Sequence, residues 1–281
     1  MNKQVNLGAA WQAMLKQAPE QWDLTHAALL IAAELESGMD MQAYEQQLAA
    51  MADAVHSRIS DDMSVNERIR EINTYFYVDS GFAGDRKDYY LPDNSLLNHV
   101  LERRRGIPIA LAVVYLKLAT TAGLDAFGIG FPGHYLVGIR DGKKQIVLDP
   151  FNQGQVLDHQ QLRDMLQQFS QQVIDEAALE RNLQPASHTD TVVRMLRNLK
   201  QIYIEAQQVE LALTCIEMIL SILPESPDEL RDRGMIYQHI EYTQGAINDL
   251  TLYLKLVPDA EERGVIEALL DSLQTQHKSL H

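Results

Sequence analysis

A histidine and an aspartate in the middle of the chain have the residue types of a general base and of the acid that orients it. His134 follows the segment FPG, and Asp149 ends the segment KQIVLD, fifteen positions further along. A carboxylate that faces an imidazole fixes the tautomer of the ring and raises its basicity, which prepares the ring to accept a proton. The alternative interpretation is a structural histidine that is hydrogen-bonded at the start of a strand.

Three short segments around this pair predict strands: DAFGIGF, HYLVGIR and KQIVLDP. Asp141–Gly142, between the last two, is a strong hairpin signal. If these two residues form the turn, Arg140 pairs with Lys143, and the paired positions sum to 283. His134 and Asp149 have the same sum, so this register predicts that they lie directly opposite each other on one face of the hairpin.

The segment RRRGIPIALAVVY predicts a junction between two helices. A helix over NSLLNHVLERRR is expected to begin at Asn94 and to end just before Gly106. Pro108 then lies in the first turn of an almost wholly apolar helix, PIALAVVYLKLATTAGL, which should be buried on most sides. A helix N-terminus can stabilise an anion, and one widespread class of hydrolases places its catalytic cysteine there.

Several ordered motifs resemble those of the bacterial SirB-type transglutaminase-like core family, whose members join this core to C-terminal tetratricopeptide (TPR) repeats. The motifs are RRGIPIALAVVYLKLATTAGL, GFPGHYLV and LDPFNQG, preceded by NTYFYVDSGFAGDRKDYYLPDNSLLNHVLERRRGIP. The resemblance implies a papain-like site in which a cysteine attacks, a histidine activates it and an aspartate orients the histidine. His134 and Asp149 take the last two places. Gly106 and Ala112 match the flanks of the cysteine motif, and the cysteine position itself falls on Pro108.

The missing nucleophile predicts a non-catalytic or catalytically altered relative, because covalent catalysis is almost wholly lost without it. The only cysteine, Cys215, is expected to be packed inside a helix of the C-terminal region. Ser95 and Tyr135 are the remaining hydroxyl candidates for a nucleophile. We therefore expect a pseudo-transglutaminase that binds a protein or peptide, with a regulatory role open to it. The alternative is a cysteine-independent amide hydrolase that uses His134 and Asp149.

Polar residues near this site are candidates for binding a ligand: Arg105, Asn94, Asn98 and Tyr135. Arg103–Arg105 form the only dense basic run, which either complements the helix dipole or contacts an anion or carboxylate. No zinc-binding spacing such as HxxEH, HExxH or CxxC occurs, and the phosphate-loop and dinucleotide fingerprints are missing. Neither a metal nor a cofactor is therefore predicted.

The C-terminal third repeats itself at a spacing of 34 residues. Four pairs obey this step: Tyr203 and Tyr237, Leu196 and Leu230, Ala212 and Ala246, and Pro224 and Pro258. The step and the residue types match the TPR pattern, in which small alanines let two helices approach closely and proline ends each unit. We expect repeats over about residues 193–226 and 227–260, followed by a capping helix, with Tyr203 and Tyr237 as partner contacts.

Repeats of this kind commonly present a concave groove to a peptide or a protein surface. Residues 225–262 contain nine acidic side chains and three basic ones, and an exposed acidic groove would favour a basic partner. The alternative is that two repeats only pack against the core and stabilise it.

Composition and charge limit the remaining functions. A net charge of −15 argues against broad binding to nucleic acid or to an anionic membrane, which disfavours a DNA-binding regulator. No apolar run approaches the roughly 20 residues of a membrane span, no signal peptide is recognisable, and one cysteine fits a reducing cytoplasm. We predict a cytoplasmic, mostly helical α+β protein. A papain-like core with a small antiparallel sheet is expected over residues 1–185, and an all-α TPR region over residues 186–281.

Overall fold

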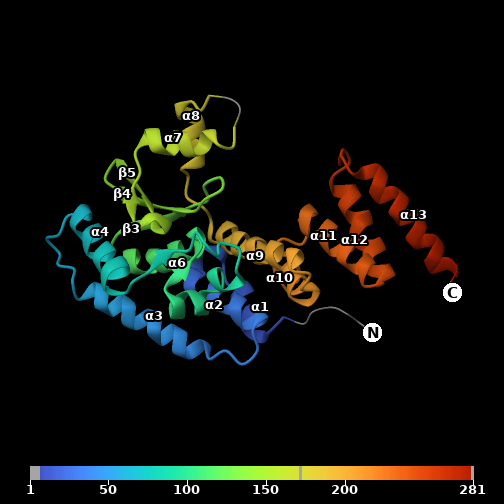
Figure 1. Cartoon of the computed structure of the whole chain (residues 1–281), viewed down its shortest axis with the longest axis horizontal. Coiled ribbons are helices and arrows are strands. Elements are labelled where there is room, and N and C mark those ends of the chain that lie inside the picture. Colours follow the sequence, from blue (N-terminus) through green and yellow to red (C-terminus); the bar gives the residue numbers. More distant parts are fainter. Residues whose placement is uncertain (1–6, 171–172, 280–281) are drawn as a thin grey trace. The chain divides into compact units, whose positions relative to one another are not determined.

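A computed structural model describes residues 7–170 and 173–279 of the chain (Figure 1). The chain divides into two compact units, of which the first is Gly8–Met195 and the second contains Leu196 and the helices that follow. The division falls within helix α9 (His188–Glu205). The first unit contains the strands and the His134–Asp149 pair, and the second contains the repeats.

The N-terminal part of the first unit is helical. Its helices are α1 (Ala9–Leu15), α2 (Leu24–Leu35), α3 (Met41–His56), α4 (Val65–Asn73), α5 (Leu97–Arg103) and α6 (Pro108–Thr121). A capping box starts α4, where the Ser64 side chain accepts from the Glu67 amide and the Glu67 carboxylate accepts from the Ser64 amide. Every residue of α6 from Pro108 to Leu116 is buried, as the apolar run predicts.

The segment between α4 and α6 contains more structure than the sequence indicates. A π-helical turn (Thr74–Asp79) extends α4, β1 (Ala83–Gly84) pairs in parallel with β2 (Arg105–Gly106), and the turn Pro92–Asn94 precedes α5. Asn94 was expected to begin α5 but lies in this turn, because Pro92 starts a short 3₁₀ segment there. Gly106 is not the helix cap either. Arg104 takes the left-handed conformation at the end of α5, with φ of 57°.

The sheet of the first unit has four antiparallel strands in the order β3–β4–β5–β6. Their bounds are β3 (Asp125–Ile129), β4 (Leu136–Asp141), β5 (Lys144–Asp149) and β6 (Gln155–Val156). Figure 1 shows α6 on one side of the strands, and α7 (His159–Gln167) and α8 (Glu176–Asn182) on the other. Leu136 and Val147 of the sheet pack with Leu162 and Leu179 of these two helices. The α+β class and the small antiparallel sheet that the sequence predicts are confirmed.

The hairpin between β4 and β5 turns one residue later than predicted. Its central residues are Gly142 and Lys143, so Asp141 pairs with Lys144 and the paired positions sum to 285. A type II′ turn needs a positive φ only at its first central residue, and Gly142 supplies one of 61°. The predicted turn, centred on Asp141 and Gly142, would have required a positive φ of Asp141. Because the sum changes by two, every side chain keeps its face, so His134 and Asp149 share a side without lying directly opposite.

The second unit consists of helical hairpins. α9 is followed by α10 (Val209–Ile222), α11 (Pro227–His239) by α12 (Thr243–Leu256), and α13 (Arg263–Ser279) comes last. In the second repeat, small residues lie where α11 and α12 touch. Ala246 is fully buried, and a Cβ atom on Gly234 would come within 2.7 Å of the Leu250 side chain. Small residues therefore allow the close helix packing that the pattern predicts.

Candidate functional site

His134 and Asp149 meet at the end of the β4–β5 hairpin that lies opposite its turn, where β4 begins and β5 ends. His134 Nε2 lies 2.9 Å from Asp149 Oδ1, and the two side chains are 15% and 2% exposed. In the neutral ring, an Nε2–H that donates to the carboxylate leaves Nδ1 as an acceptor. Within residues 7–170 and 173–275, Nδ1 has no hydrogen-bond partner. This dyad therefore has the arrangement of an oriented base whose second nitrogen is available.

A tight turn and an arginine position His134. The His134 amide donates to the Phe131 carbonyl at 3.1 Å, and Gly133 between them has a φ of 65°, as in a type II turn. From α9, Arg194 Nη2 donates to the carbonyls of Phe131 and His134 at 2.9 and 2.6 Å. Sequence reasoning missed Arg194, because it lies 60 positions from His134 and no local pattern links them.

Asp149 is held by the short turn Pro150–Asn152 that it caps. Its Oδ1 accepts from the amides of Phe151 and Asn152 at 3.0 and 3.2 Å, and its Oδ2 accepts from Asn152 Nδ2 at 2.6 Å. Burial alone would raise the pKa of Asp149, but the hydrogen bond and charge interaction with His134, together with the Asn152 bonds, lower it overall. Asp149 is therefore ionised at neutral pH and fixes the orientation of the ring.

A row of aromatic rings extends from the dyad. The edge of Phe151 meets the His134 ring at a centroid distance of 5.9 Å, and Tyr89 lies 6.2 Å from Phe151. Tyr90 lies 5.1 Å from Tyr89 and is 72% exposed. The segment before α5 thus places two tyrosines in a row that reaches the dyad through Phe151.

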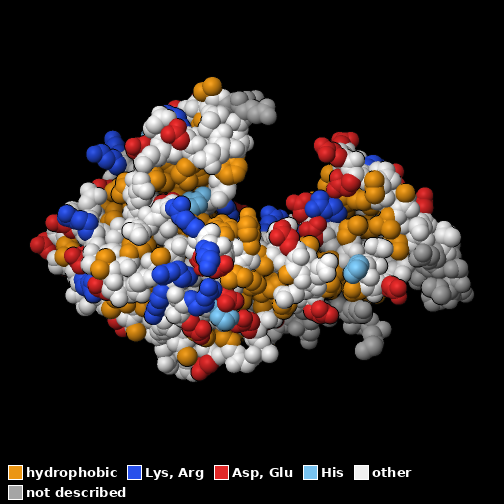
Figure 2. All heavy atoms as spheres, in the orientation of Figure 1, with side chains coloured by type: hydrophobic (Ala, Val, Ile, Leu, Met, Phe, Trp, Pro, Cys, Tyr) orange, Lys and Arg blue, Asp and Glu red, His pale blue; other side chains and the backbone are white. Residues whose placement is uncertain are grey.

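Two further side chains complete this surface. The Arg86 guanidinium lies 5.8 Å from the centre of the Phe151 ring and donates a hydrogen bond to the Asn152 side chain. Phe169 packs on Gly133, where a Cβ atom would overlap its ring, and is 61% exposed. On the face seen in Figure 2, Lys and Arg side chains gather in a strip across the first unit. We call the surface around the dyad the dyad rim, which consists of Arg86, Tyr89, Tyr90, Phe151 and Phe169.

The position that the resemblance assigns to the nucleophile provides no reactive atom. Pro108 is the first residue of α6 and is buried, and proline has neither a thiol nor a backbone N–H. Of the two hydroxyl alternatives, Ser95 is buried, and its Oγ has no hydrogen-bond partner among the described residues. The Tyr135 hydroxyl lies 2.7 Å from Thr191 Oγ1, and burial raises its pKa to about 12. Neither hydroxyl is prepared to attack a substrate.

The predicted ligand-binding residues mostly have structural partners. Asn94 is buried and donates to the Asp88 carbonyl at 2.6 Å, and buried Asn98 donates to Glu36 at 2.7 Å. Tyr135 is equally buried, so a direct contact of these three side chains with a ligand has no geometric support. Arg105 is exposed, and its Nη1 donates to the carbonyls of Gly81 and Arg104.

Cys215 lies fully buried in α10. Burial raises the pKa of its thiol far above the ordinary value, so the thiol stays protonated at neutral pH and is a poor nucleophile. Within the described ranges, no three His, Cys, Asp or Glu side chains converge in a way that could hold a metal ion. In the same ranges, no helix is both long enough and apolar enough to cross a membrane.

The repeat tyrosines lie inside the packing of the second unit. Tyr203 and Tyr237 are 3% and 4% exposed, and the Tyr237 hydroxyl donates to Glu217 at 3.2 Å. Both rings therefore shape the repeats, and their contact with a partner stays a prediction.

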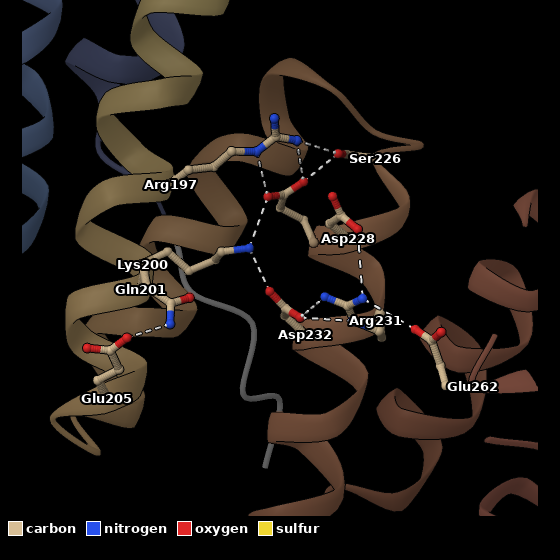
Figure 3. A network of polar contacts seen from close by, with 10 residues as sticks. Arg197, Lys200, Gln201, Glu205, Ser226, Asp228, Arg231, Asp232 and Glu262 are labelled. Atoms are coloured by element: carbon tan, nitrogen blue, oxygen red, sulfur yellow. Dashed lines mark hydrogen bonds and ion pairs between the residues drawn. The ribbon is translucent and has the colours of Figure 1, made fainter. Parts of the chain in front are cut away.

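Ion pairs neutralise much of the acidic excess in the repeats (Figure 3). Glu229 is fully buried between Arg197, at 3.0 Å, and Lys200, at 3.1 Å, and Lys200 also contacts Asp232 at 2.6 Å. Burial alone would raise the pKa of Glu229, but hydrogen bonds from Arg197, Ser226 and Lys200 lower it to about 2. The count of acidic residues alone therefore overstates the acidity that a partner would meet.

Comparisons with known proteins agree with the motifs. Residues 42–197 match the transglutaminase-like superfamily, and residues 199–271 match the tetratricopeptide repeat. A UPF0162 protein of Xylella fastidiosa (strain 9a5c) is 34% identical over 272 residues, which are 96% of this chain and 97% of that protein. Protein SirB1 of Salmonella typhimurium is 28% identical over 236 residues, which are 84% of this chain and 87% of SirB1. Among solved structures, menin aligns at a TM-score of 0.41 and 10% identity over 88% of this chain and 68% of menin, which is too weak to support an argument.

Proposed function

The chain belongs to the transglutaminase-like superfamily and is homologous to the UPF0162 and SirB1 proteins, and from this premise we propose that it is a pseudoenzyme that binds a protein or peptide. The observation that supports this most is Pro108 at the first turn of α6, where the family's reaction needs a thiol. Cys215, the only cysteine, is buried and protonated, so it does not substitute.

Two features of the site suit the recognition of a peptide: a hydrogen-bond acceptor on His134 and exposed aromatic side chains around it. With its Nε2–H bonded to Asp149, His134 offers Nδ1 as an acceptor for an N–H group of a bound chain. Tyr90 and Phe169 add exposed apolar area on the dyad rim, and aromatic side chains commonly anchor protein interfaces. The TPR repeats supply a second surface of a class that binds proteins. The single cysteine fits a cytoplasmic location.

Site-specific photo-crosslinking in the living bacterium tests this function. A benzoylphenylalanine placed at Tyr90 should form a discrete adduct with a partner protein, and the adduct should weaken strongly when His134→Ala is added. The matched control is the same crosslinker at Val78, which is 75% exposed but lies outside the dyad rim. An identical set of adducts from both positions, or none at Tyr90, would contradict a binding role of the rim.

The alternative is a hydrolase that activates water without cysteine. It is favoured by one observation, the unengaged Nδ1 of an oriented, partly exposed histidine. A screen of amide and ester substrates with wild-type protein and His134→Ala separates the two functions. We expect no turnover by either protein. Turnover that is lost in His134→Ala would replace the pseudoenzyme proposal with the hydrolase.

A further inference from the structure

The geometry points to an acidic peptide segment of a partner protein as the occupant of the dyad rim, with its carboxylates bound by Arg86 and Arg194. This inference rests on the proposed peptide-binding function and adds the chemical class of the peptide. This acidic peptide differs from the basic partner that the composition of the repeats would favour, because the two partners would bind different surfaces.

Arg86 is an exposed cation that has no carboxylate partner among the residues that the structure describes. Its interactions are with the Phe151 ring and the Asn152 side-chain oxygen, and both neighbours are neutral. Asn152 in turn donates to Asp149 at 2.6 Å, so Arg86 is only one residue removed from the dyad. A ring and an amide orient the guanidinium while its charge stays uncompensated, which suits a bidentate contact with a carboxylate.

Arg194 is a second cation of this kind on another side of His134. Its Nη2 group bonds only to the carbonyls of Phe131 and His134, and no acidic side chain within the described ranges pairs with it. Burial lowers the pKa of its guanidinium, and Tyr89 is close enough to interact with the charge. The Arg194 guanidinium also packs over the Tyr135 ring at 5.6 Å, and within the described residues its Nε and Nη1 donate no hydrogen bond.

Acidic partners are common among the other arginines of the described residues, although Arg68 and Arg105 also bond only to backbone carbonyls. Arg233 contacts Asp249 at 2.7 Å and Glu217 at 2.9 Å, and Arg197 contacts buried Glu229 at 3.0 Å. A chain with 39 acidic and 24 basic residues has acids in excess for such pairs. Within the described residues, two guanidinium groups without an acidic partner therefore lie beside one aromatic surface, where they outnumber the single carboxylate of the dyad, Asp149. Charge complementarity of this kind selects an acidic partner.

The test is a peptide array probed with the full-length wild-type chain. The array holds random dodecapeptides, and the strongest binders are resynthesised for fluorescence-anisotropy titration. We expect the binders to be enriched in Asp and Glu. Arg86→Glu should weaken their binding about tenfold or more, equivalent to about 1.4 kcal/mol. Arg194→Gln should also weaken binding, while Arg194→Lys, which keeps the charge, should retain part of it.

Lys143→Glu is the matched control, because it makes the same charge change in the hairpin turn beyond β4. The six residues of β4 separate this turn from His134 by about 20 Å. Binding by this variant should stay within about twofold of wild type. Circular dichroism checks the fold of each variant. Loss of Arg194 could disturb the His134 turn that it bonds to. Arg86 is exposed, so Arg86→Glu tests the acidic specificity independently of that turn.

The outcomes separate this inference from the proposed function. Neutral or basic binders that depend on His134 but not on Arg86 would overturn the acidic specificity and leave peptide binding intact. Equal loss of binding in Arg86→Glu and Lys143→Glu would also overturn it, because the effect would then come from net charge alone. An array without any binder that His134→Ala weakens would overturn the proposed function itself.

Discussion

Single buried carboxylates shape both units of the molecule. In the first unit Asp149 accepts from His134, and in the second Glu229 accepts from Arg197 and Lys200. Removing a carboxylate from water is unfavourable unless hydrogen bonds and opposite charges replace the lost solvation. These partners outweigh burial, so both carboxylates have lowered pKa values and stay ionised at neutral pH.

Glu229 gives the clearest pH dependence. Its pKa is about 2 in the folded chain against an ordinary 4.5, so the unfolded chain binds this proton more tightly. The resulting stabilisation is complete above about pH 4.5 and is lost as the pH falls towards 2. We expect Glu229→Gln to destabilise the second unit by about 3 kcal/mol at pH 7 and by about half of this at pH 3.

Urea unfolding of wild type and Glu229→Gln at the two pH values measures this difference. The matched control is Glu225→Gln, which makes the same chemical change at an exposed carboxylate in the turn before α11. The control should change stability by less than about 0.5 kcal/mol. A Glu229→Gln effect of the same size at pH 7 and pH 3 would show that the ion pairs do not stabilise the repeats.

Among secondary-structure elements, the Gly133 turn controls where His134 points. Gly133 has a φ of 65°, and a Cβ atom there would overlap the Phe169 ring, whereas Gly142 has a φ of 61° and open space around it. Gly142→Ala should therefore lower stability by about 1 kcal/mol, from backbone strain alone. Gly133→Ala should lower it by about 2–3 kcal/mol and also displace Phe169.

Thermal unfolding of these two glycine variants, combined with the Tyr90 crosslinking yield, tests the role of the turn. We expect the adduct to be lost in Gly133→Ala and retained in Gly142→Ala. Equal losses of stability and equal yields in both variants would mean that Phe169 does not depend on Gly133 for its place on the dyad rim.

The sequence predicted the elements of this site better than their register. The strand segments and the hairpin signal between them found β4 and β5, and the predicted hairpin register placed His134 beside Asp149. The turn was misplaced by one residue because a type II′ turn at Gly142–Lys143 and a turn at Asp141–Gly142 have similar local signals. The pair survived this error because the side-chain period of a strand is two.

Contacts between distant segments could not be predicted in the same way. Arg194 reaches the His134 carbonyl across 60 positions, and the Phe169 ring meets Gly133 from beyond α7. Neither contact leaves a periodic or spacing signal in the sequence. The buried Asn94 was expected to begin a helix and bind a ligand, because a helix-capping residue and a loop residue look alike until the packing around them is known.

For the whole molecule, two features support the proposed role in recognition. The first unit has an oriented histidine and an aromatic rim, and Pro108 lies where the resemblance places a thiol; the second unit matches a repeat class that commonly binds proteins. The net charge of −15 is spread unevenly, since Arg86 and Arg194 stay unpaired within the described ranges next to the dyad. Fold and family follow from the sequence, whereas the identity of a partner depends on how these local charges are exposed.

Restoring a thiol at residue 108 tests most directly whether Pro108 fills the place of a lost nucleophile. In Pro108→Cys, the helix start and His134 should stabilise the thiolate, so we expect its pKa to lie below the ordinary value of about 8.5. Thiolate absorbance against pH measures this, and the buried Cys215 thiol stays protonated in that range. A lowered pKa that returns to the ordinary value in Pro108→Cys/His134→Ala is the predicted result. An ordinary or raised thiol pKa that does not change with His134 would contradict the assignment and, with it, the pseudoenzyme account.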